Sequence, residues 1–302
     1  MFNQFIEQFK QQELGLIREN EQLSKHTSFR VGGQARVFVI PKDKASLREV
    51  MRLVKSEQLP YRIIGRGSNL LPSDRVYEGV VIKCDKGLNH VEVDGTLVTV
   101  GAGVSTIVLA NQLAKLKLAG FEFLSGVPGS MGGAIFMNAG AYKSEVKDIL
   151  VKALIIDEFG EFVWKENHEF EFDYRVSIMQ KRRDWTIVEA VIQLEVGDTE
   201  TILELMQRRK VRRIASQPME YPSAGSTFRN PMPRFSWELI DEAGLRGYRI
   251  GDAQVSTKHS NFVVNVGQAT AQDIYDLIYH IQRVVYEQSG VMLHPEVELF
   301  NW

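Results

Sequence analysis

Residues 125–141 read Ser-Gly-Val-Pro-Gly-Ser-Met-Gly-Gly-Ala-Ile-Phe-Met-Asn-Ala-Gly-Ala and carry five glycines but no charged side chain. Glycine costs conformational entropy in a regular element, so this density is typical of tight turns or of backbone N–H groups that approach phosphate oxygens. A mobile linker fits poorly, because Val127, Met131 and Ile135 are apolar, whereas flexible linkers are rich in serine and charge. The segment therefore predicts a phosphate-bearing ligand held close to the backbone.

A second glycine cluster follows a short apolar strand at residues 61–64 and reads Gly65-Arg66-Gly67-Ser68-Asn69-Leu70-Leu71. A third turn, Gly101-Ala102-Gly103, follows a strand predicted over 97–100 and precedes a helix that we expect Ser105 to cap. Neither large cluster has the Lys-Ser or Lys-Thr of a P-loop, or the strand, Gly-x-Gly-x-x-Gly and helix of a Rossmann fingerprint. The pattern disfavours both of those classes, and three glycine turns suggest one long, extended cofactor.

Composition is that of an ordinary soluble chain, with 302 residues, 44% of them apolar and 25% charged, which is enough for about two or three domains. A net charge of −2 argues against a general nucleic-acid binder, although residues 208–213 are basic. Cys84 is the only cysteine, so no intramolecular disulfide is possible, and we expect it to be a small buried residue. The six histidines show no zinc spacing, so we expect no metal.

The N-terminus has no basic segment followed by an apolar one, and no stretch approaches the roughly 20 apolar residues of a membrane span. We therefore expect a cytoplasmic protein. Periodicity predicts mixed α and β structure, with helices at 44–57, 199–214 and 271–288 and an amphipathic stretch at 237–243. Pro218 and Pro222 follow the second of these helices and predict a boundary to a further unit near 197–204.

The two glycine clusters stand in order with several other motifs, and together these resemble the UDP-N-acetylenolpyruvoylglucosamine reductase family over nearly the whole chain. The other motifs are Thr27-Ser-Phe-Arg-Val-Gly-Gly33, Phe172-Asp-Tyr-Arg175, Ser223-Ala-Gly-Ser-Thr-Phe-Arg-Asn-Pro231, Ala253-Gln-Val-Ser-Thr-Lys-His259 and Pro295-Glu-Val297.

The resemblance implies an α+β fold with a two-lobed FAD-binding domain of the vanillyl-alcohol oxidase type, followed by a separate α+β substrate-binding domain. The expected divisions are a first lobe at 1–83, a second lobe at 84–200 and a substrate domain at 201–302. A C-terminal strand near 295–302 is expected to return to the active site.

The resemblance also implies noncovalent FAD, with NADPH as the hydride donor, and His26 is then a turn or cap residue rather than a flavin attachment point. The implied cofactor-binding residues belong to the glycine turns and the residues that follow them. They are Gly65, Arg66, Gly67, Ser68, Asn69, Leu70, Gly101, Gly126, Pro128, Gly129, Ser130, Gly132, Gly133, Asn138, Ala139, Gly140 and Ala141.

The implied reaction adds a hydride to the β carbon of an enol ether conjugated to a carboxylate, and then a proton to the α carbon. An enolate-like intermediate needs a fixed cation or acid at the carboxylate and a proton donor. Arg175, Ser226 and Glu296 match the family's positions for these catalytic roles. Arginine suits the first because its planar guanidinium can hold a carboxylate with two hydrogen bonds. Around Ser226 there is no Gly-x-Ser-x-Gly elbow, so serine hydrolysis is a weak rival.

Two departures from the family pattern bear on substrate binding. Ser216 stands where the family commonly has lysine before the Pro of this loop, so the diphosphate charge must come from other residues. Arg212, Arg213 and Arg229 are the candidates, with Asn230 for the uridyl-sugar side. In addition, His294 stands where the family often has Glu, which leaves Glu296 as the acid of that segment. The length indicates the shorter subtype of the family.

The expected partners are small molecules, a UDP-sugar and NADPH, with no nucleic acid and no membrane, and we expect a monomer. Two rival functions remain open from the sequence. Another flavin oxidase of the same fold would reoxidise quickly in air and would not need NADPH. A noncatalytic nucleotide-sugar binding protein would be colourless.

Overall fold

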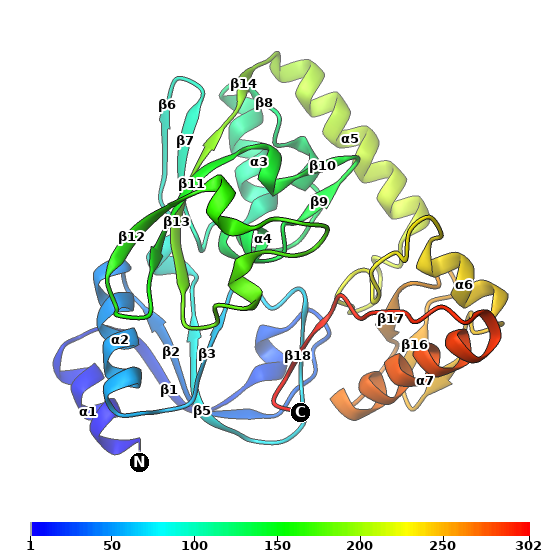
Figure 1. Cartoon of the computed structure of the whole chain (residues 1–302), viewed down its shortest axis with the longest axis horizontal. Helices are drawn as coiled ribbons and strands as arrows, with labels where there is room; N and C mark the ends of the chain where they lie inside the picture. The colour runs from blue at the N-terminus through cyan, green and yellow to red at the C-terminus, as the bar shows by residue number, and fades with distance from the viewer. Residues whose placement is uncertain (1) are drawn as a thin grey trace. The chain divides into compact units, whose positions relative to one another are not determined.

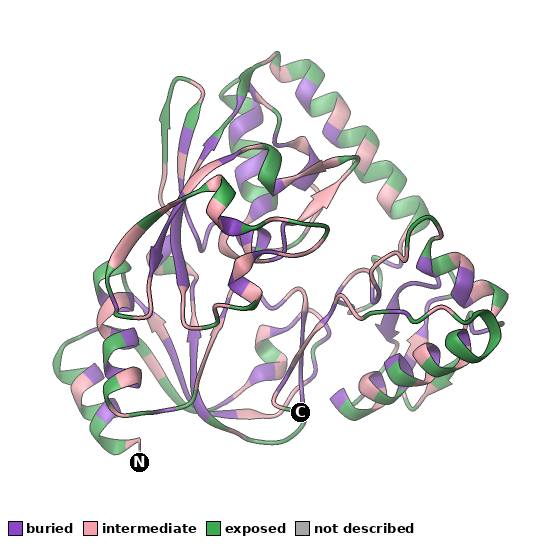
Figure 2. Ribbon diagram, viewed as in Figure 1, coloured by how far each residue is buried: buried purple, intermediate pink, exposed green. Residues whose placement is uncertain are grey.

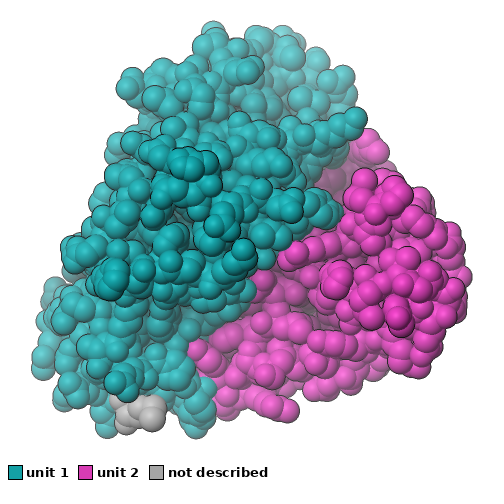
Figure 3. Space-filling view, in the orientation of Figure 1, with its two compact units in different colours: residues 1–21, 36–66, 78–210 teal, residues 22–35, 67–77, 211–302 magenta. Residues whose placement is uncertain are grey.

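The computed structural model describes residues 2–302. The chain folds into two compact units, which Figure 3 shows in different colours. Of the described residues, unit 1 comprises 2–21, 36–66 and 78–210, and unit 2 comprises 22–35, 67–77 and 211–302. Each unit has its own buried apolar core. The predicted divisions at residues 83 and 200 remain a prediction.

The first sheet of unit 1 has the strand order β1-β2-β5-β3, in which β3 runs parallel to β5. Asp43 starts α2 by accepting a 2.7 Å hydrogen bond from the backbone of Ser46. The buried residues of α2 recur at helical spacing and face the core. The elements are α1 (Asn3–Gln11), β1 (Gly15–Gln22), β2 (Gln34–Pro41), α2 (Lys44–Ser56), β3 (Tyr61–Ile64) and β5 (Tyr77–Lys83).

The second sheet of unit 1 has five strands in the order β12-β11-β13-β7-β6, all antiparallel. Figure 2 shows buried residues along its central strands β11 and β13. One core is shared by both sheets, which agrees with the two-lobed flavin-binding domain expected from the sequence. The elements are β6 (Val91–Asp94), β7 (Leu97–Gly101), α3 (Thr106–Lys115), α4 (Met131–Phe136), β11 (Leu150–Ile156), β12 (Phe162–Glu166) and β13 (Thr186–Gln193).

Short paired segments extend this part of unit 1. β8 (Leu118–Ala119) pairs with β14 (Glu195–Val196), and β9 (Gly140–Ala141) pairs with β10 (Ser144–Glu145). Ser105 occupies the N-cap of α3, but its side chain makes no capping hydrogen bond, so the expected cap is wrong. Its backbone instead forms a bridge with Ser130. Cys84 is buried as expected, and burial raises the pKa of its thiol to about 12.

Unit 2 is built around α7 (Ala271–Ser289), which packs on a three-stranded antiparallel sheet. Thr270 and Asp273 form a capping box at its start, and Gly290 with φ 70° ends it. The sheet consists of β15 (Arg249–Ile250), β16 (Ala253–Val255) and β17 (Val263–Asn265), and α6 (Ser236–Glu242) also contacts α7. The short strand β4 (Leu70–Pro72) pairs in parallel with β18 (Glu298–Phe300).

The helix α5 (Thr199–Ser216), which is labelled in Figure 1, begins in unit 1 and ends in unit 2. Only Ile202 and Met206 are buried along it. The helices predicted at 44–57, 199–214 and 271–288 are confirmed to within two residues. Among residues 2–302, none of the helices combines the length and apolar character that crossing a membrane would need.

Replacing Ile278 by Ala removes a side chain that is fully buried in the core of unit 2. We expect the free energy of unfolding to fall by about 2–5 kcal/mol, because the transfer free energy of the removed apolar atoms is lost and a cavity is left in the core. Tyr286→Ala on the same helix, where Tyr286 is half exposed, is the control and is expected to stay within about 0.5 kcal/mol. Urea denaturation followed by circular dichroism measures both, and equal losses would contradict a core role for this face of α7.

Candidate functional site

Gly65, which begins the turn at 65–71, meets the other two glycine segments within unit 1. A side chain at Gly65 would collide with the hydroxyl of Ser130, so the end of β3 lies against the glycine segment 125–141. That segment is also bonded to the turn at 101–103 and the residue after it, since the backbone of Gly132 donates to Ala102 O at 2.9 Å and that of Met131 to Val104 O at 2.9 Å. Segments that are far apart in the sequence therefore form one surface, as a single extended ligand requires.

Most of these glycines are demanded by the protein's own packing. A Cβ at Gly101 or Gly103 would overlap a backbone carbonyl of the facing loop, and a Cβ at Gly140 would lie 2.5 Å from Ser144 O. Gly67 combines φ +65° with close approach to the backbone of His26, which ends a 3-10 turn as expected. These positions need glycine whether or not a ligand is bound.

Gly133 differs from them. A Cβ there would meet only the hydroxyl of Ser130, at an ordinary contact distance of 3.4 Å. Its φ does not lie in the left-handed region, and it sits in the regular helix α4. The fold thus has no need of glycine here, and the space that a side chain would fill suits a large ligand pressed against the backbone. FAD fits this requirement.

Arg175 lies in a tight turn whose backbone is closed by two hydrogen bonds between Asp173 and Val176, at 3.1 and 3.0 Å. Its φ is +57°, an uncommon conformation for a residue with a side chain. The carbonyl of Arg175 accepts from Gln180 Nε2 at 2.9 Å. Its guanidinium donates to Gly140 O at 2.7 Å. The guanidinium is therefore fixed against the glycine segment 125–141, and the backbone carbonyl is fixed by Gln180.

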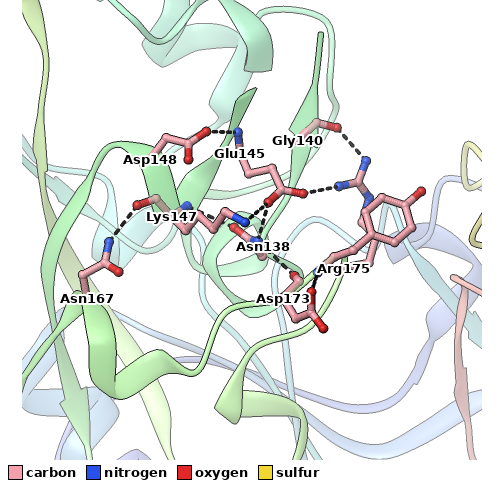
Figure 4. Close-up of polar contacts among 9 residues, drawn as sticks. Asn138, Gly140, Glu145, Lys147, Asp148, Asn167, Asp173 and Arg175 are labelled. Carbon is pink, nitrogen blue, oxygen red and sulfur yellow. Dashed lines mark hydrogen bonds and ion pairs between the residues drawn. The ribbon is translucent and has the colours of Figure 1, made fainter. Parts of the chain in front are cut away.

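A buried amide joins this turn to the hairpin of β9 and β10 (Figure 4). Asn138 is fully buried; its Nδ2 donates to Asp173 O at 3.0 Å and to Glu145 Oε2 at 3.1 Å, and its Oδ1 accepts from Lys147 N at 3.0 Å. The structure shows the polar side-chain atoms of Asn138 bonded within the protein. Its expected role in cofactor binding stays a prediction. Glu145 also lies 3.7 Å from Arg175 Nη1.

Sequence reasoning missed Glu145. It is one carboxylate in the polar run that follows the uncharged glycine cluster, and nothing in its immediate sequence singles it out. Only the pairing of β10 with β9, which opposes Glu145 to Gly140, places it beside the Arg175 turn.

In unit 2, the structure brings together the segments that carry Ser226 and Glu296. The backbone of Glu296 donates to Thr227 O at 2.8 Å, Phe228 forms a bridge with Pro295, and the backbone of Arg229 donates to His294 O at 2.9 Å. The C-terminal segment therefore lies beside the loop that carries Ser226, and the expectation that it returns to the active site stays a prediction. Arg175 belongs to unit 1.

The segment at 261–263 also holds the serine loop, through hydrogen bonds to Thr227 and Phe228. Asn261 is buried and pairs with Phe228 as a backbone strand would, accepting from its N–H at 3.0 Å and donating to its carbonyl at 2.9 Å. The hydroxyl of Thr227 accepts from Val263 N at 3.0 Å. Both residues were missed, because the segment around Asn261 lies more than thirty positions from the loop that it supports.

The second glycine cluster of the sequence prediction also reaches the C-terminal segment. Asn69 Nδ2 donates to the carbonyl of Glu296 at 2.9 Å, and the backbone of Glu298 donates to Asn69 O at 2.9 Å. Gly67, Ser68, Asn69 and Leu70 all belong to unit 2, with Leu70 paired in β4. Asn69 therefore connects this loop to the backbone of Glu296.

The candidate diphosphate residues differ in what surrounds them. Arg212 is exposed on α5, and Arg213 Nε donates to Gln217 Oε1 at 2.9 Å. The Nε atom of Arg229 is buried and makes no hydrogen bond within the described residues 2–302. Asn230 Oδ1 accepts from the backbone of Ser236 at 3.1 Å, at the first turn of α6.

In residues 2–302, no cluster of three or more His, Cys, Asp or Glu side chains is arranged to hold a metal ion. Two family models match separate parts of the chain. The FAD binding domain matches residues 35–165, and the C-terminal domain of UDP-N-acetylenolpyruvoylglucosamine reductase matches residues 217–300.

Individual relatives match almost the full length. The chain is 47% identical over 296 residues to the UDP-N-acetylenolpyruvoylglucosamine reductase of Bacillus licheniformis, covering 98% of each chain. It is 45% identical to the protein of that name from Bacillus subtilis, with the same coverage. The crystal structure of UDP-N-acetylenolpyruvylglucosamine reductase from Thermus caldophilus is 33% identical, with a TM-score of 0.82 over 94% of this chain and 100% of that chain.

Replacing Gly133 separates folding from cofactor binding. We expect Gly133→Ala to leave the flavin-free protein as stable as before or up to about 1 kcal/mol more stable, because alanine is the better helix former and its Cβ has room. The same methyl group should weaken FAD binding, and the larger Gly133→Val should abolish it.

Thermal unfolding of the flavin-free variants and titration with FAD measure the two effects. Normal FAD affinity in a folded Gly133→Val variant would contradict the placement of FAD at α4.

Proposed function

The chain belongs to the UDP-N-acetylenolpyruvoylglucosamine reductase family, and we propose that Arg175, Ser226 and Glu296 carry the family's reaction in it. It is an FAD-dependent oxidoreductase that acts in peptidoglycan precursor synthesis and uses NADPH. The likeness over 98% of the chain to relatives of this name is the observation that carries the function.

The reaction converts the enolpyruvyl ether of UDP-N-acetylglucosamine into the lactyl ether of UDP-N-acetylmuramate. FAD, when bound, supplies to the β carbon the hydride that NADPH delivers. Negative charge then develops on the α carbon and the carboxylate of the substrate, and one proton must reach the α carbon. The protein therefore has to hold this charge and deliver this proton.

Arg175 is proposed to bind the substrate carboxylate. The planar N–H groups of its guanidinium match the two carboxylate oxygens. Support comes from the fixed backbone of its turn and from the bond to Gly140 O, which orient the side chain before substrate arrives.

Ser226 is proposed to donate the proton to the α carbon and to regain it from solvent. A hydroxyl is a weak acid, but a carbon-centred enolate is basic enough to take its proton. Glu296 is proposed to act on the same charge, as a protonated acid beside the developing enolate. The backbone bonds between residues 227–229 and 294–296 support these roles, because they hold both residues on adjacent segments.

Arg229 is proposed to bind the diphosphate of the UDP-sugar in place of the family's lysine at 216. Its buried, unused Nε supports this, since an unpaired buried donor is costly unless a ligand completes it. Arg212, Arg213 and Asn230 are proposed to complete substrate binding. We also propose a cytoplasmic monomer that binds no nucleic acid, which light scattering after gel filtration would check for mass.

Purification gives the first test of the function. We expect a yellow protein that releases FAD on acid denaturation and oxidises one NADPH for each enolpyruvyl substrate reduced. A protein that is colourless and cannot be reconstituted would favour a nucleotide-sugar binding protein. Rapid reoxidation in air with an alcohol or sugar donor, without need for NADPH, would favour a flavin oxidase.

Ser226→Ala tests protonation separately from hydride delivery. NADPH-driven flavin reduction should stay close to normal, because no enolate forms in that half-reaction. Reoxidation by the enolpyruvyl substrate should slow by about 10²–10⁴-fold or more, the usual range for a general acid. Ser226→Cys restores an ionisable proton donor and should recover part of the loss. Stopped-flow absorbance follows each step, and slowed reduction with normal reoxidation would contradict this role.

A further inference from the structure

We propose that Glu145 is a positioning residue for the reaction: its carboxylate fixes the guanidinium of Arg175 in the orientation that receives the substrate's carboxylate. This inference rests on the proposed function, in which Arg175 binds that carboxylate. Figure 4 shows Glu145 between Asn138, Lys147 and Arg175.

The two oxygens of Glu145 have different partners. Oε2 accepts from Asn138 Nδ2 at 3.1 Å and pairs with Lys147 Nζ at 2.9 Å, while Oε1 lies 3.7 Å from Arg175 Nη1. Because the buried amide of Asn138 anchors Oε2, the direction in which Oε1 points is set by the core and not by a mobile surface side chain. Glu145 therefore presents a fixed negative charge to the guanidinium.

The guanidinium is held at several points around its plane. Nη2 donates to Gly140 O at 2.7 Å, and the guanidinium carbon lies 4.9 Å from the centre of the Tyr174 ring. Glu145 supplies the ionic contact at Nη1. The side chains of Arg175 and Glu145 are only 17% and 19% exposed, so solvent screens this pair less than an exposed surface pair.

The same hairpin ties Glu145 to the glycine that Arg175 binds. Glu145 pairs with Gly140 across β9 and β10, and a Cβ at Gly140 would lie 2.7 Å from Glu145 Cγ. Asn138 completes the connection by bonding both Glu145 and the carbonyl of Asp173 in the arginine turn. The carboxylate, the glycine carbonyl and the turn are thus one bonded assembly within unit 1.

A positioning role predicts a particular kinetic signature. Loss of the charge at 145 leaves Arg175 cationic, and even removes a competing anion, so substrate should bind at least as well as before. The orientation of the guanidinium toward the developing charge is lost, and misplacement on the scale of 1 Å can cost about 10²-fold in rate. The limiting rate of the half-reaction that uses the enolpyruvyl substrate should fall, while its half-saturation concentration should not rise.

The test uses the FAD-loaded enzyme, reduced anaerobically with NADPH and mixed with UDP-N-acetylglucosamine enolpyruvate in a stopped-flow instrument. For Glu145→Gln, which keeps the side-chain shape, we expect the limiting rate of reoxidation to fall about 10- to 100-fold. FAD content and the rate of flavin reduction by NADPH should be unchanged. Lys147→Ala is the matched control, because it removes the more exposed partner of the same carboxylate, and should stay within about twofold.

A double variant tests whether Glu145 acts through Arg175. Arg175→Lys alone should slow reoxidation, and adding Glu145→Gln should slow it little further, because the two residues form one unit. Multiplying losses would overturn the proposal. So would loss of FAD or slowed flavin reduction in Glu145→Gln, which would indicate a structural role, and so would a wild-type rate of reoxidation in that variant.

Failure of the proposed function would give a different result. Wild-type reduced enzyme would then not be reoxidised by the enolpyruvyl substrate, or Arg175→Lys would be reoxidised at the wild-type rate. If Arg175→Lys is slow and Glu145→Gln is normal, only the role of Glu145 fails.

Discussion

The backbone pairing of residues 294–298 is the constraint on which the arrangement of the loops in unit 2 depends. On one side this segment is bonded to residues 227–229, and on the other to Asn69 and β4. Three parts of the chain that are far apart in sequence are thereby held in one register. Ser226 and Glu296 need no side-chain contact with each other to be placed, because the ladder between their neighbours places them. The buried Asn261 extends the same ladder with a side chain.

The glycine clusters show how a ligand surface is built from two kinds of constraint. Gly101, Gly103 and Gly140 let backbones approach each other, so they shape the surface from within. At Gly133, by contrast, no neighbouring backbone requires glycine, and the position that a Cβ would occupy is open apart from the hydroxyl of Ser130. Read from sequence, the two kinds look the same. Only the three-dimensional neighbours of each Cα separate a glycine that the fold needs from one whose Cβ would have room.

The sequence predicted what local pattern determines. The apolar spacing of α2 and α7 located these helices to within two residues, and the strand-then-glycine order located the turns at 65–71 and 101–103. It did not reveal that residues 22–35 and 67–77 belong to unit 2, because that depends on pairing across more than 200 positions. Nor did it single out Glu145, whose contact with Arg175 arises from a hairpin and a buried amide. Long-range register has no local signature.

The parallel pairing of β4 with β18 constrains when unit 2 can fold during synthesis of the chain. Residues 70–72 leave the ribosome some 230 residues before residues 298–300 exist, which at about 5–20 residues per second amounts to roughly ten to fifty seconds. During that interval the edge of β4 has no strand to pair with. The carboxylate of Asp74 also lacks the hydrogen bonds that it accepts from the first backbone N–H groups of α7. Closing so long a loop is slow. Unit 2, and with it the ladder that carries Ser226 and Glu296, is therefore completed only after residues 298–300 have been made.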